Sequence, residues 1–518
     1  MKKTVFLSLA AILLLTACGK DEITTVEAYY FDNVDNVTFD RTVTITYSSA
    51  TATVDGTSSD QSVSTSGAGV TITNLGSEVV KYVLSGSTTD GYLKIYSAQA
   101  QAIVLNGVSI ANPAGAAINV QGPADDPSSG ERLFLVLSGA STLADGSTYS
   151  ATPEDEDEKA ALFAEGVIAI SGSGSLTVNA SGKSGIASDD YVHLSEGTVT
   201  VNSTASTSVS NGDTLKIAGI KSKDDFVVDG GTLVVSASGT GAKGISGDSA
   251  AHFNGGSVTV TVTGSNFGTS TSGGMGPGNS SSNGVAAKGV KFDGDITISG
   301  GTLTVSAANH EGIESKTNIT VGGGKTYSYS GADDAVNASG DITLSGGYLA
   351  AISTANDGLD ANGSLYLKGG VLYAVGATSP EEAIDVNIGE TSGVELVLDG
   401  GTIIAIGGLS SGAELNQSCY SASYTSGTVY TLLDGSTTYS FTAPAGAGSP
   451  LVVSGTAVSL YSGGTLSGGT ACCNNALTVG ATLTGGSSVS LSAYSGGNGG
   501  GGGNPGGGPG GGGHHISH

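Results

Sequence analysis

The sequence predicts an all-β fold: a right-handed parallel β-helix with three-strand coils of about 23 residues, followed by a C-terminal β segment. Segments such as DITIS and GTLTVSA alternate apolar and polar residues, as half-buried strands do. A small residue followed by an aliphatic recurs at spacings near 23, and the chain contains 86 glycines for sharp turns. Coils this short bury their apolar faces only by stacking on each other.

The repeat is clearest in its aliphatic positions. Eight copies centre on Ile186, Ile220, Ile245, Val290, Ile313, Val336, Leu359 and Ile384, and the last five lie 23, 23, 23 and 25 residues apart. A glycine stands eleven residues after the aliphatic in the first seven copies. We expect strands near GIES, DITIS and GTLTVSA, with this glycine at the corner before the third strand. Weaker copies centre on Ile118 and Leu162, and the longer spacings predict loops at 151–160 and 264–284.

The N-terminus reads as a targeting segment. Residues 1–18, MKKTVFLSLAAILLLTAC, place two lysines before an apolar run and LTAC, which resembles a bacterial lipoprotein signal cleaved before Cys18. An ordinary secretory signal that contains a cysteine is the alternative. A lipid on Cys18 would anchor the chain to a membrane without crossing it. The following GKDE resembles an export signal of surface lipoproteins, so we expect an outer-membrane lipoprotein exposed at the cell surface.

The rest of the chain divides by composition. We expect a linker at 19–34, the parallel β-helix domain at 35–409, a C-terminal β cap or module at 410–495 and a Gly-rich flexible tail at 496–518. Three cysteines remain after processing, and Cys419 is expected to pair with Cys472 or Cys473.

Charge limits the partners. The chain carries 45 acidic and 18 basic residues, a net charge of −27, which disfavours nucleic acid and anionic lipid as ligands. We expect a monomer that binds cations, or polyanions through a cation bridge.

Acidic residues recur at two positions of the later coils, two before and one after the aliphatic. Asp333 stands one place earlier still, three residues before its aliphatic. We define the acid ladder as Glu311, Glu314, Asp333, Asp334, Asn337, Asp357, Asp360, Glu382 and Asp385. Stacked coils lie about 4.8 Å apart, and two carboxylates about 5 Å apart repel by about 3 kcal/mol at a dielectric near 20. Either the edge is solvated or a cation lies in it. A wall of Asp, Glu and Asn oxygens suits Ca²⁺, so the ladder is the predicted calcium site.

The succession of coils resembles a known family. The segments GYLKIYSAQAQAIVLNGVSI, GIASDDYVHLSEGTVTV, GIKSKDDFVVDGGTLVV and DGLDANGSLYLKGGVLYAVG are similar to bacterial carbohydrate-binding proteins described as pectate-lyase-like. The resemblance covers roughly residues 60–460 and implies a right-handed parallel β-helix that binds polygalacturonate and calcium. It implies that the stacked acids hold the calcium.

The predicted function is calcium-dependent, non-catalytic binding of an acidic polysaccharide. Calcium would bridge the acid ladder to the uronates, and the predicted sugar-contacting residues are Lys243, Lys288, Lys291, Tyr327 and Tyr373. A pectate-lyase-like enzyme is the first alternative. The resemblance implies that such an enzyme uses a base that is usually Arg and sometimes Lys. The only arginines, Arg41 and Arg132, precede the ladder, so the base would be Lys288 or Lys291. A structural surface adhesin is the second alternative.

Overall fold

The structure is a computed structural model that describes residues 32–123, 131–153, 156–210, 212–268, 284–389 and 391–496. The predicted signal peptide, Cys18 and nearly all of the Gly-rich tail lie outside these residues, as does most of the predicted loop 264–284. Strands dominate the described chain, accompanied by a short 3-10 helix, Val34–Asn36. Within these residues no helix combines the length and the apolar character required to span a bilayer.

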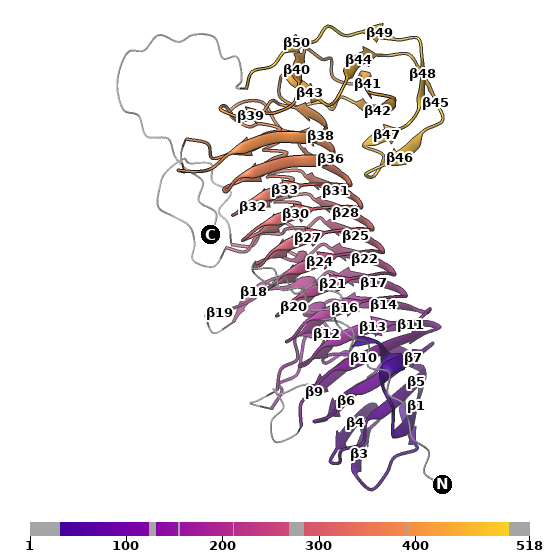
Figure 1. The fold of residues 1–518 in the computed structure, drawn as a ribbon. Helices are drawn as coiled ribbons and strands as arrows, with labels where there is room; N and C mark the ends of the chain where they lie inside the picture. Colours follow the sequence, from indigo (N-terminus) through magenta and orange to yellow (C-terminus); the bar gives the residue numbers. More distant parts are fainter. Residues whose placement is uncertain are drawn as a thin grey trace, which may run out of the picture.

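Three parallel stacks of strands run along the molecule (Figure 1). The first stack is a 13-stranded sheet. Its strands are β3 (Gln61–Ser66), β4 (Ala68–Asn74), β6 (Gly91–Tyr96), β9 (Ile118–Gln121), β12 (Ala160–Ala164), β15 (Ser184–Ser188), β20 (Ala218–Ser222), β23 (Lys243–Gly247), β26 (Val290–Phe292), β29 (Ile313–Ser315), β32 (Val336–Ala338), β35 (Leu359–Ala361) and β37 (Ile384–Val386). Apart from the β3–β4 hairpin, neighbours in this stack are parallel.

The second stack begins with β1 and β5, and β2 pairs with β1 in an antiparallel hairpin. Its strands are β1 (Arg41–Ser48), β2 (Thr51–Asp55), β5 (Val80–Thr88), β7 (Gln101–Asn106), β10 (Leu133–Ser138), β13 (Ile168–Ser171), β16 (Val192–Leu194), β21 (Phe226–Val228), β24 (Ala251–Phe253), β27 (Ile296–Ile298), β30 (Ile319–Val321) and β33 (Ile342–Leu344). It continues into the first halves of two long strands, β36 (Leu365–Val375) and β38 (Leu396–Ile406).

The third stack ends in the second halves of β36 and β38. Its other strands are β8 (Ser109–Ala111), β11 (Ala140–Ala144), β14 (Ser175–Ala180), β17 (Thr198–Ser203), β22 (Thr232–Ala237), β25 (Ser257–Val262), β28 (Thr302–Ala307), β31 (Lys325–Ser330) and β34 (Tyr348–Ser353). A small hairpin, β18 (Ser208–Ser210) with β19 (Asp213–Leu215), projects between coils.

The pairing register follows the repeat read from the sequence. Val290 pairs with Ile313, Ile313 with Val336, and Val336 with Leu359. The weaker copies are also coils, because Leu162 pairs with both Ile118 and Ile186. An all-β fold of long parallel stacks is therefore confirmed, and the right-handed winding stays a prediction.

Glycine marks the corner before the third stack, as predicted. Gly324 directly precedes β31 with φ +69°, and a Cβ there would lie 2.5 Å from the carbonyl oxygen of Gly300 in the coil below. The left-handed backbone disfavours any other residue, and the close carbonyl adds a steric clash. The corner thus depends on glycine for two separate reasons.

Replacing Gly324 with Ala is expected to lower the free energy of unfolding by about 2 kcal/mol or more, measured by urea denaturation. Gly393→Ala is the matched control, since Gly393 has φ +83° with nothing within 4 Å of its added Cβ. The control loses only the backbone contribution. Equal losses in the two variants would contradict the proposed clash.

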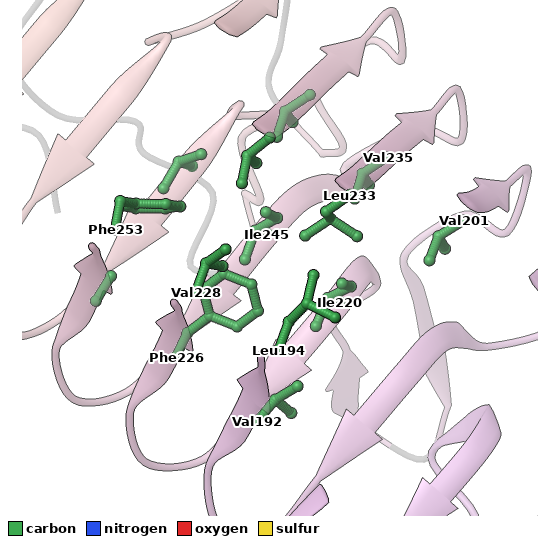
Figure 2. Packing of buried hydrophobic residues seen from close by; sticks show 14 of the residues in the cluster. Val192, Leu194, Val201, Ile220, Phe226, Val228, Leu233, Val235, Ile245 and Phe253 are labelled. Atoms are coloured by element: carbon green, nitrogen blue, oxygen red, sulfur yellow. The ribbon is translucent and has the colours of Figure 1, made fainter. Parts of the chain in front are cut away.

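The inner faces of the three stacks form one continuous apolar column. Figure 2 shows aliphatic side chains from successive coils, such as Val192, Ile220 and Leu233, meeting inside it. Phenylalanines fill the centre, where the ring centroid of Phe226 lies 6.0 Å from that of Phe253 and 6.2 Å from that of Phe292. This packed column holds the outward-facing residues of each coil in register.

After β38 the chain changes to mostly antiparallel pairing. The strands are β39 (Glu414–Leu415), β40 (Cys419–Ala422), β41 (Val429–Asp434), β42 (Thr437–Thr442), β43 (Leu451–Ser454), β44 (Val458–Ser462), β45 (Thr465–Ser467), β46 (Thr470–Cys472), β47 (Leu477–Val479), β48 (Thr482–Thr484), β49 (Ser487–Ser488) and β50 (Ser492–Ala493). We call residues 419–493 the C-terminal module. It lies at one end of the stacks (Figure 1) and shares a second apolar cluster with the third stack.

The expected disulfide of Cys419 is absent, because all three described cysteines are free. Cys419 belongs to the main apolar column and donates a hydrogen bond to Ser454 Oγ at 3.2 Å. Cys472 and Cys473 lie in the second cluster, with their Sγ atoms 3.4 Å apart. The prediction was wrong because Cys419 is buried in one apolar cluster and Cys472 and Cys473 in another. The sequence alone does not reveal which cluster each cysteine enters.

Candidate functional site

The acid ladder is one continuous set of stacked residues along the first stack. Strand pairing places Glu314 beside Asn337, Asn337 beside Asp360, and Asp360 beside Asp385. Each of these residues follows the buried aliphatic of its strand, so its side chain points away from the core. The predicted stacking of this column is therefore present.

The column two positions before the aliphatic is stacked as well. The amide N–H of Asp357 donates to Asp334 Oδ1 at 3.2 Å, and the amide N–H of Glu382 donates to Asp357 Oδ1 at 2.5 Å. Each carboxylate thus caps the backbone of the next coil. One oxygen of each carboxylate, Oδ1, is engaged in this way, and Asp357 Oδ2 is left for another ligand.

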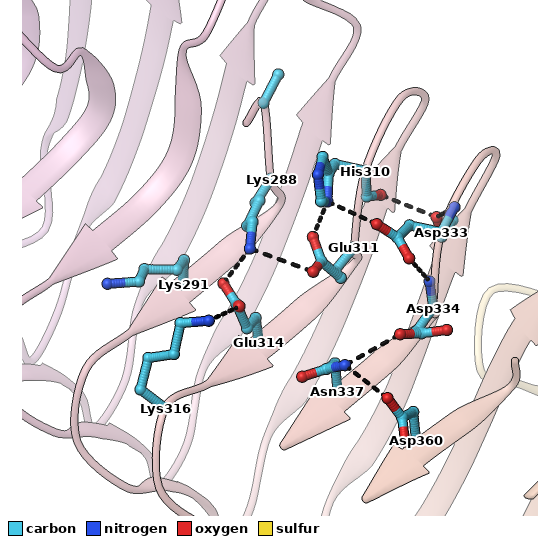
Figure 3. Close-up of polar contacts among 12 residues, drawn as sticks. Lys288, Lys291, His310, Glu311, Glu314, Lys316, Asp333, Asp334, Asn337 and Asp360 are labelled. Atoms are coloured by element: carbon cyan, nitrogen blue, oxygen red, sulfur yellow. Dashed lines mark hydrogen bonds and ion pairs between the residues drawn. The ribbon is translucent and has the colours of Figure 1, made fainter. Parts of the chain in front are cut away.

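One end of the ladder is neutralised by lysine, and we call it the basic end (Figure 3). Lys288 Nζ lies 2.6 Å from Glu314 Oε2 and 3.2 Å from Glu311 Oε1, and Lys316 Nζ lies 2.6 Å from Glu314 Oε1. Lys288, Glu311 and Glu314 are all buried. Burial alone would lower the pKa of Lys288, but the two glutamates hold it above its usual value.

His310 extends the basic end by one column. Its Nδ1 contacts Glu311 Oε2 and lies 2.9 Å from Asp333 Oδ2, while Asn356 Nδ2 donates to Asp333 Oδ1 at 2.9 Å. Burial opposes charging of the imidazole, but Asp333 and Glu311 raise the pKa of His310 to about 9. Glu311, Glu314 and Asp333 therefore already have cationic partners, which makes them weaker candidates for metal ligation than predicted.

The next coils form the acidic end: Asp334, Asn337, Asp357, Asp360, Glu382 and Asp385. Asn337 Nδ2 donates to Asp334 Oδ2 and to Asp360 Oδ2, both at 3.0 Å (Figure 3). Among the described residues, no lysine, arginine or histidine forms an ion pair with Asp334, Asp357 or Asp360. Three carboxyl groups are thus held together without a cationic side chain.

Burial and mutual repulsion shift the titration of these groups. Burial is the largest cause at each position and raises the pKa of Asp357 to about 10, with Asp334, Asp385 and Asp360 adding to it. The pKa values of Asp334 and Asp360 are also raised, first by burial and then by neighbouring carboxylates. At neutral pH the acidic end must take up protons or bind a cation.

The donor set of the acidic end fits calcium. Its side chains offer carboxylate oxygens and one amide oxygen, Asn337 Oδ1, from three successive coils. Calcium accepts six to eight such oxygens in irregular geometry, whereas zinc prefers nitrogen and sulfur. His310, Glu311 and Asp333 also bring ligand atoms within 4.8 Å of one another, but the imidazole already pairs with both acids there.

Two of the predicted sugar-contacting lysines lie on the strands before the ladder. Lys243, on β23, is half-buried, and burial together with Lys288 and Lys291 lowers its pKa to about 7. Lys291 stands beside Glu314 in the pairing of β26 with β29, and its ammonium pairs with Asp293. The third, Lys288, is the buried partner of Glu311 and Glu314 described above.

The burial of Tyr373 contradicts its predicted role as a sugar contact, whereas the role predicted for the partly buried Tyr327 stays a prediction. Tyr373 is 2% exposed, its ring lies 5.3 Å from that of Phe441, and its hydroxyl donates to the Thr442 carbonyl. Tyr327 packs against the same cluster of the C-terminal module. Both stand on the third stack, away from the first-stack column that carries the acids.

Sequence reasoning missed a second group of carboxylates, Asp157, Glu165 and Asp189. The signal that could have found two of them is the third position after the aliphatic in each coil. Glu165 and Asp189 each stand three residues after the aliphatic of their coil, Leu162 and Ile186.

A family model described as "Carbohydrate-binding domain-containing protein" matches residues 66–335 and 211–380, and the first range alone spans more than half of the 518 residues. The chain belongs to this family. The matched ranges of this carbohydrate-binding protein contain the ladder from Glu311 to Asp360 and stop just before Glu382. Family membership identifies a glycan as the class of partner.

A solved structure described as "polysaccharide lyase-like protein from C. thermocellum, Gadolinium derivative" is 18% identical to this carbohydrate-binding protein. The alignment covers 58% of this chain and 96% of the other, with a TM-score of 0.37. No curated protein matches the chain. The family model, and not this structure, therefore carries the identification.

Proposed function

We propose that this protein binds acidic polysaccharide of the polygalacturonate class, without cleaving it, through calcium held by the acidic end of the ladder. The observation that carries the proposal is the group of Asp334, Asp357 and Asp360, which have no cationic side-chain partner among the described residues. Burial first, and then repulsion between neighbouring carboxylates, raises the pKa values of these three groups, and a bound cation would offset both costs.

The charge of the proposed ligand follows from the charge of the site once calcium is bound. A polyuronate would be repelled by bare carboxylates, whereas bound calcium would reverse the local charge and share its coordination with the sugar carboxylates. Lys291 and Lys243 lie on the neighbouring strands, on the side of the basic end. Lys291, which also pairs with Asp293, and the protonated form of Lys243 add positive charge that favours a polyanion.

The basic end has a structural role in this proposal. Lys288, Lys316 and His310 neutralise Glu311, Glu314 and Asp333, so the calcium ligands are confined to Asp334, Asn337, Asp357, Asp360, Glu382 and Asp385. For location, the proposal keeps the lipid anchor at Cys18 and display at the cell surface, on the sequence of residues 1–18.

The test is binding to insoluble pectin with and without calcium. The wild-type protein is expected to sediment with pectin at 1 mM calcium and to stay in solution in chelator. Asp357→Asn/Asp360→Asn is expected to weaken binding by at least about 100-fold, because it removes two of the anionic calcium ligands. Asp224→Asn/Asp248→Asn, at exposed positions, is the charge-matched control. Equal retention of all three proteins in chelator would contradict a calcium bridge.

A polysaccharide lyase is a second candidate, favoured by one observation. The lowered pKa of Lys243, about 7, would make its amine available as a base near neutral pH. Lys288, in contrast, is kept charged by two glutamates. The unsaturated products of a lyase absorb ultraviolet light. Because we propose binding without cleavage, the protein mixed with polygalacturonate and calcium is expected to show no rise in absorbance. A rise that Lys243→Met abolishes would establish the lyase instead.

A further inference from the structure

A second set of converging carboxylates lies in the N-terminal half of the β-helix. One ligand atom from each of Asp157, Glu165 and Asp189 falls within 4.8 Å of the others. Glu165 follows β12 and Asp189 follows β15 in the first stack, whereas the acid ladder begins at β29. Strands β20, β23 and β26 lie between the two sets in the order of the first stack, so they are separate sites.

Strand register positions this second set. The amide N–H of Glu165 donates to the Val120 carbonyl at 3.0 Å, and the amide N–H of Asp189 donates to the Ala164 carbonyl at 3.1 Å. Because Ala164 pairs with Val120 and with Ser188, Glu165 stands between Gln121 and Asp189 on successive coils. Asp157 enters from the segment before β12, and its carbonyl accepts a bond from Gln121 Nε2 at 2.8 Å.

The charges in this set do not balance. Lys159 Nζ pairs with Asp157 at 2.6 Å and also with Asp189. Glu165 forms no ion pair with the described residues, is only 6% exposed, and its Oε1 has no hydrogen-bond partner among them. Gln121 is 1% exposed, and its Oε1 is likewise without a partner. Lys159 is the one ammonium that forms ion pairs within this set, and Lys223 adds a second nearby positive charge to Glu165. Three carboxylates still outnumber these two ammonium groups, and two buried oxygens remain unsatisfied.

A buried carboxylate with an unsatisfied oxygen is costly unless a cation or a proton meets it. Burial, with Asp189 and Asp157 as further causes, raises the pKa of Glu165 to about 7. A proton would satisfy one oxygen of Glu165 only. A divalent cation would satisfy all three carboxylates and can take the neighbouring amide oxygen of Gln121 as well, and all of these are oxygen donors of the kind that calcium prefers.

We propose that Glu165, Asp189 and Asp157 form a second calcium site that joins consecutive coils of the N-terminal half, independently of the acid ladder and its glycan. Lys159 competes with the cation, because its ammonium lies between two of the ligands. The site therefore binds calcium more weakly than its three carboxylates alone would.

The test is calorimetric titration of calcium into the chelator-treated full chain, with the number of bound ions counted by native mass spectrometry. Glu165→Gln is expected to bind one ion fewer than the wild type. Asp157→Asn, at an exposed position, is expected to weaken that ion at least about tenfold without a folding defect. Glu196→Gln, an exposed acid, is the charge-matched control and keeps the wild-type count.

Two further variants separate this site from the ladder. Asp334→Asn/Asp357→Asn/Asp360→Asn is expected to retain one ion, which Glu165→Gln then removes. Lys159→Gln is expected to tighten the same ion about tenfold by removing a competing charge, a gain that a purely structural acid cluster would not give. Unchanged stoichiometry and affinity in both Glu165→Gln and Asp157→Asn would overturn the proposal, whatever the fate of the ladder.

Discussion

In chelator, Asp334→Asn/Asp357→Asn/Asp360→Asn is expected to unfold at a higher temperature than the wild type, and in millimolar calcium the order is expected to reverse. The Asn oxygens can still accept the backbone bonds that Asp334 and Asp357 accept now. What the variant loses is the cost of these buried acids, which must either be held protonated or repel one another. Each ionised pair about 5 Å apart would repel by about 3 kcal/mol at a dielectric near 20. Scanning calorimetry under both conditions measures the reversal.

The calcium arm follows from linkage. A ligand that binds only the folded state stabilises it by about 2.7 kcal/mol at a concentration 100 times its dissociation constant. The wild type is expected to gain this amount, and the triple variant almost none of it at the ladder. Asp213→Asn/Asp224→Asn/Asp248→Asn, three exposed acids, is the charge-matched control and should respond to calcium as the wild type does. A triple variant less stable than the wild type in chelator would show that the three carboxylates stabilise the folded state without calcium, and it would contradict the expected repulsion.

The same groups set the pH dependence of the calcium-free protein. Burial raises the pKa of Asp357 to about 10 in the folded chain, against a pKa of about 4 in the unfolded chain, so between these values the folded state binds more protons. The free energy of unfolding therefore falls as pH rises through this window. We expect the melting temperature in chelator to drop from pH 5 to pH 9, and calcium to flatten that slope, because calcium binds the deprotonated carboxylates.

The stacking of the ladder was predictable because the repeat fixes it. Spacings of 23 residues between Ile313, Val336 and Leu359 translate directly into strand pairs. The corner glycines were predictable for the same reason, since each coil needs the same left-handed residue at the same place. Regular stacking makes local sequence patterns into spatial neighbours, which is rarely true of other folds.

What depended on longer contacts was not predictable. Tyr373 is buried because the C-terminal module packs Phe441 against it, a contact that no repeat spacing encodes. Lys288 occupies the ladder position one coil before Glu311, so its neighbourhood was visible in sequence, but its burial was not. The set around Glu165 includes Asp157, which comes from an irregular segment outside the coil pattern.

Lys288→Met is expected to lower the free energy of unfolding by about 3–5 kcal/mol, the usual cost of removing one partner from a buried ion pair. Lys288 contacts both Glu311 and Glu314, and the two glutamates are 2% and 0% exposed. Without the ammonium, only Lys316 and His310 remain to balance them. Urea denaturation of the full chain measures the loss.

Lys291→Met is the matched control, because its partner Asp293 is 46% exposed and a surface pair contributes less than about 1 kcal/mol. Adding Glu314→Gln to Lys288→Met should recover part of the stability, since it removes one of the stranded charges. The comparison also separates the roles first predicted for Lys288. A lysine that served mainly as a base or a uronate ligand would be replaceable with little loss of stability, whereas a lysine that holds Glu311 and Glu314 away from calcium is not. Small losses in the free energy of unfolding of both single variants would contradict this structural role and favour the predicted role of Lys288 in ligand binding.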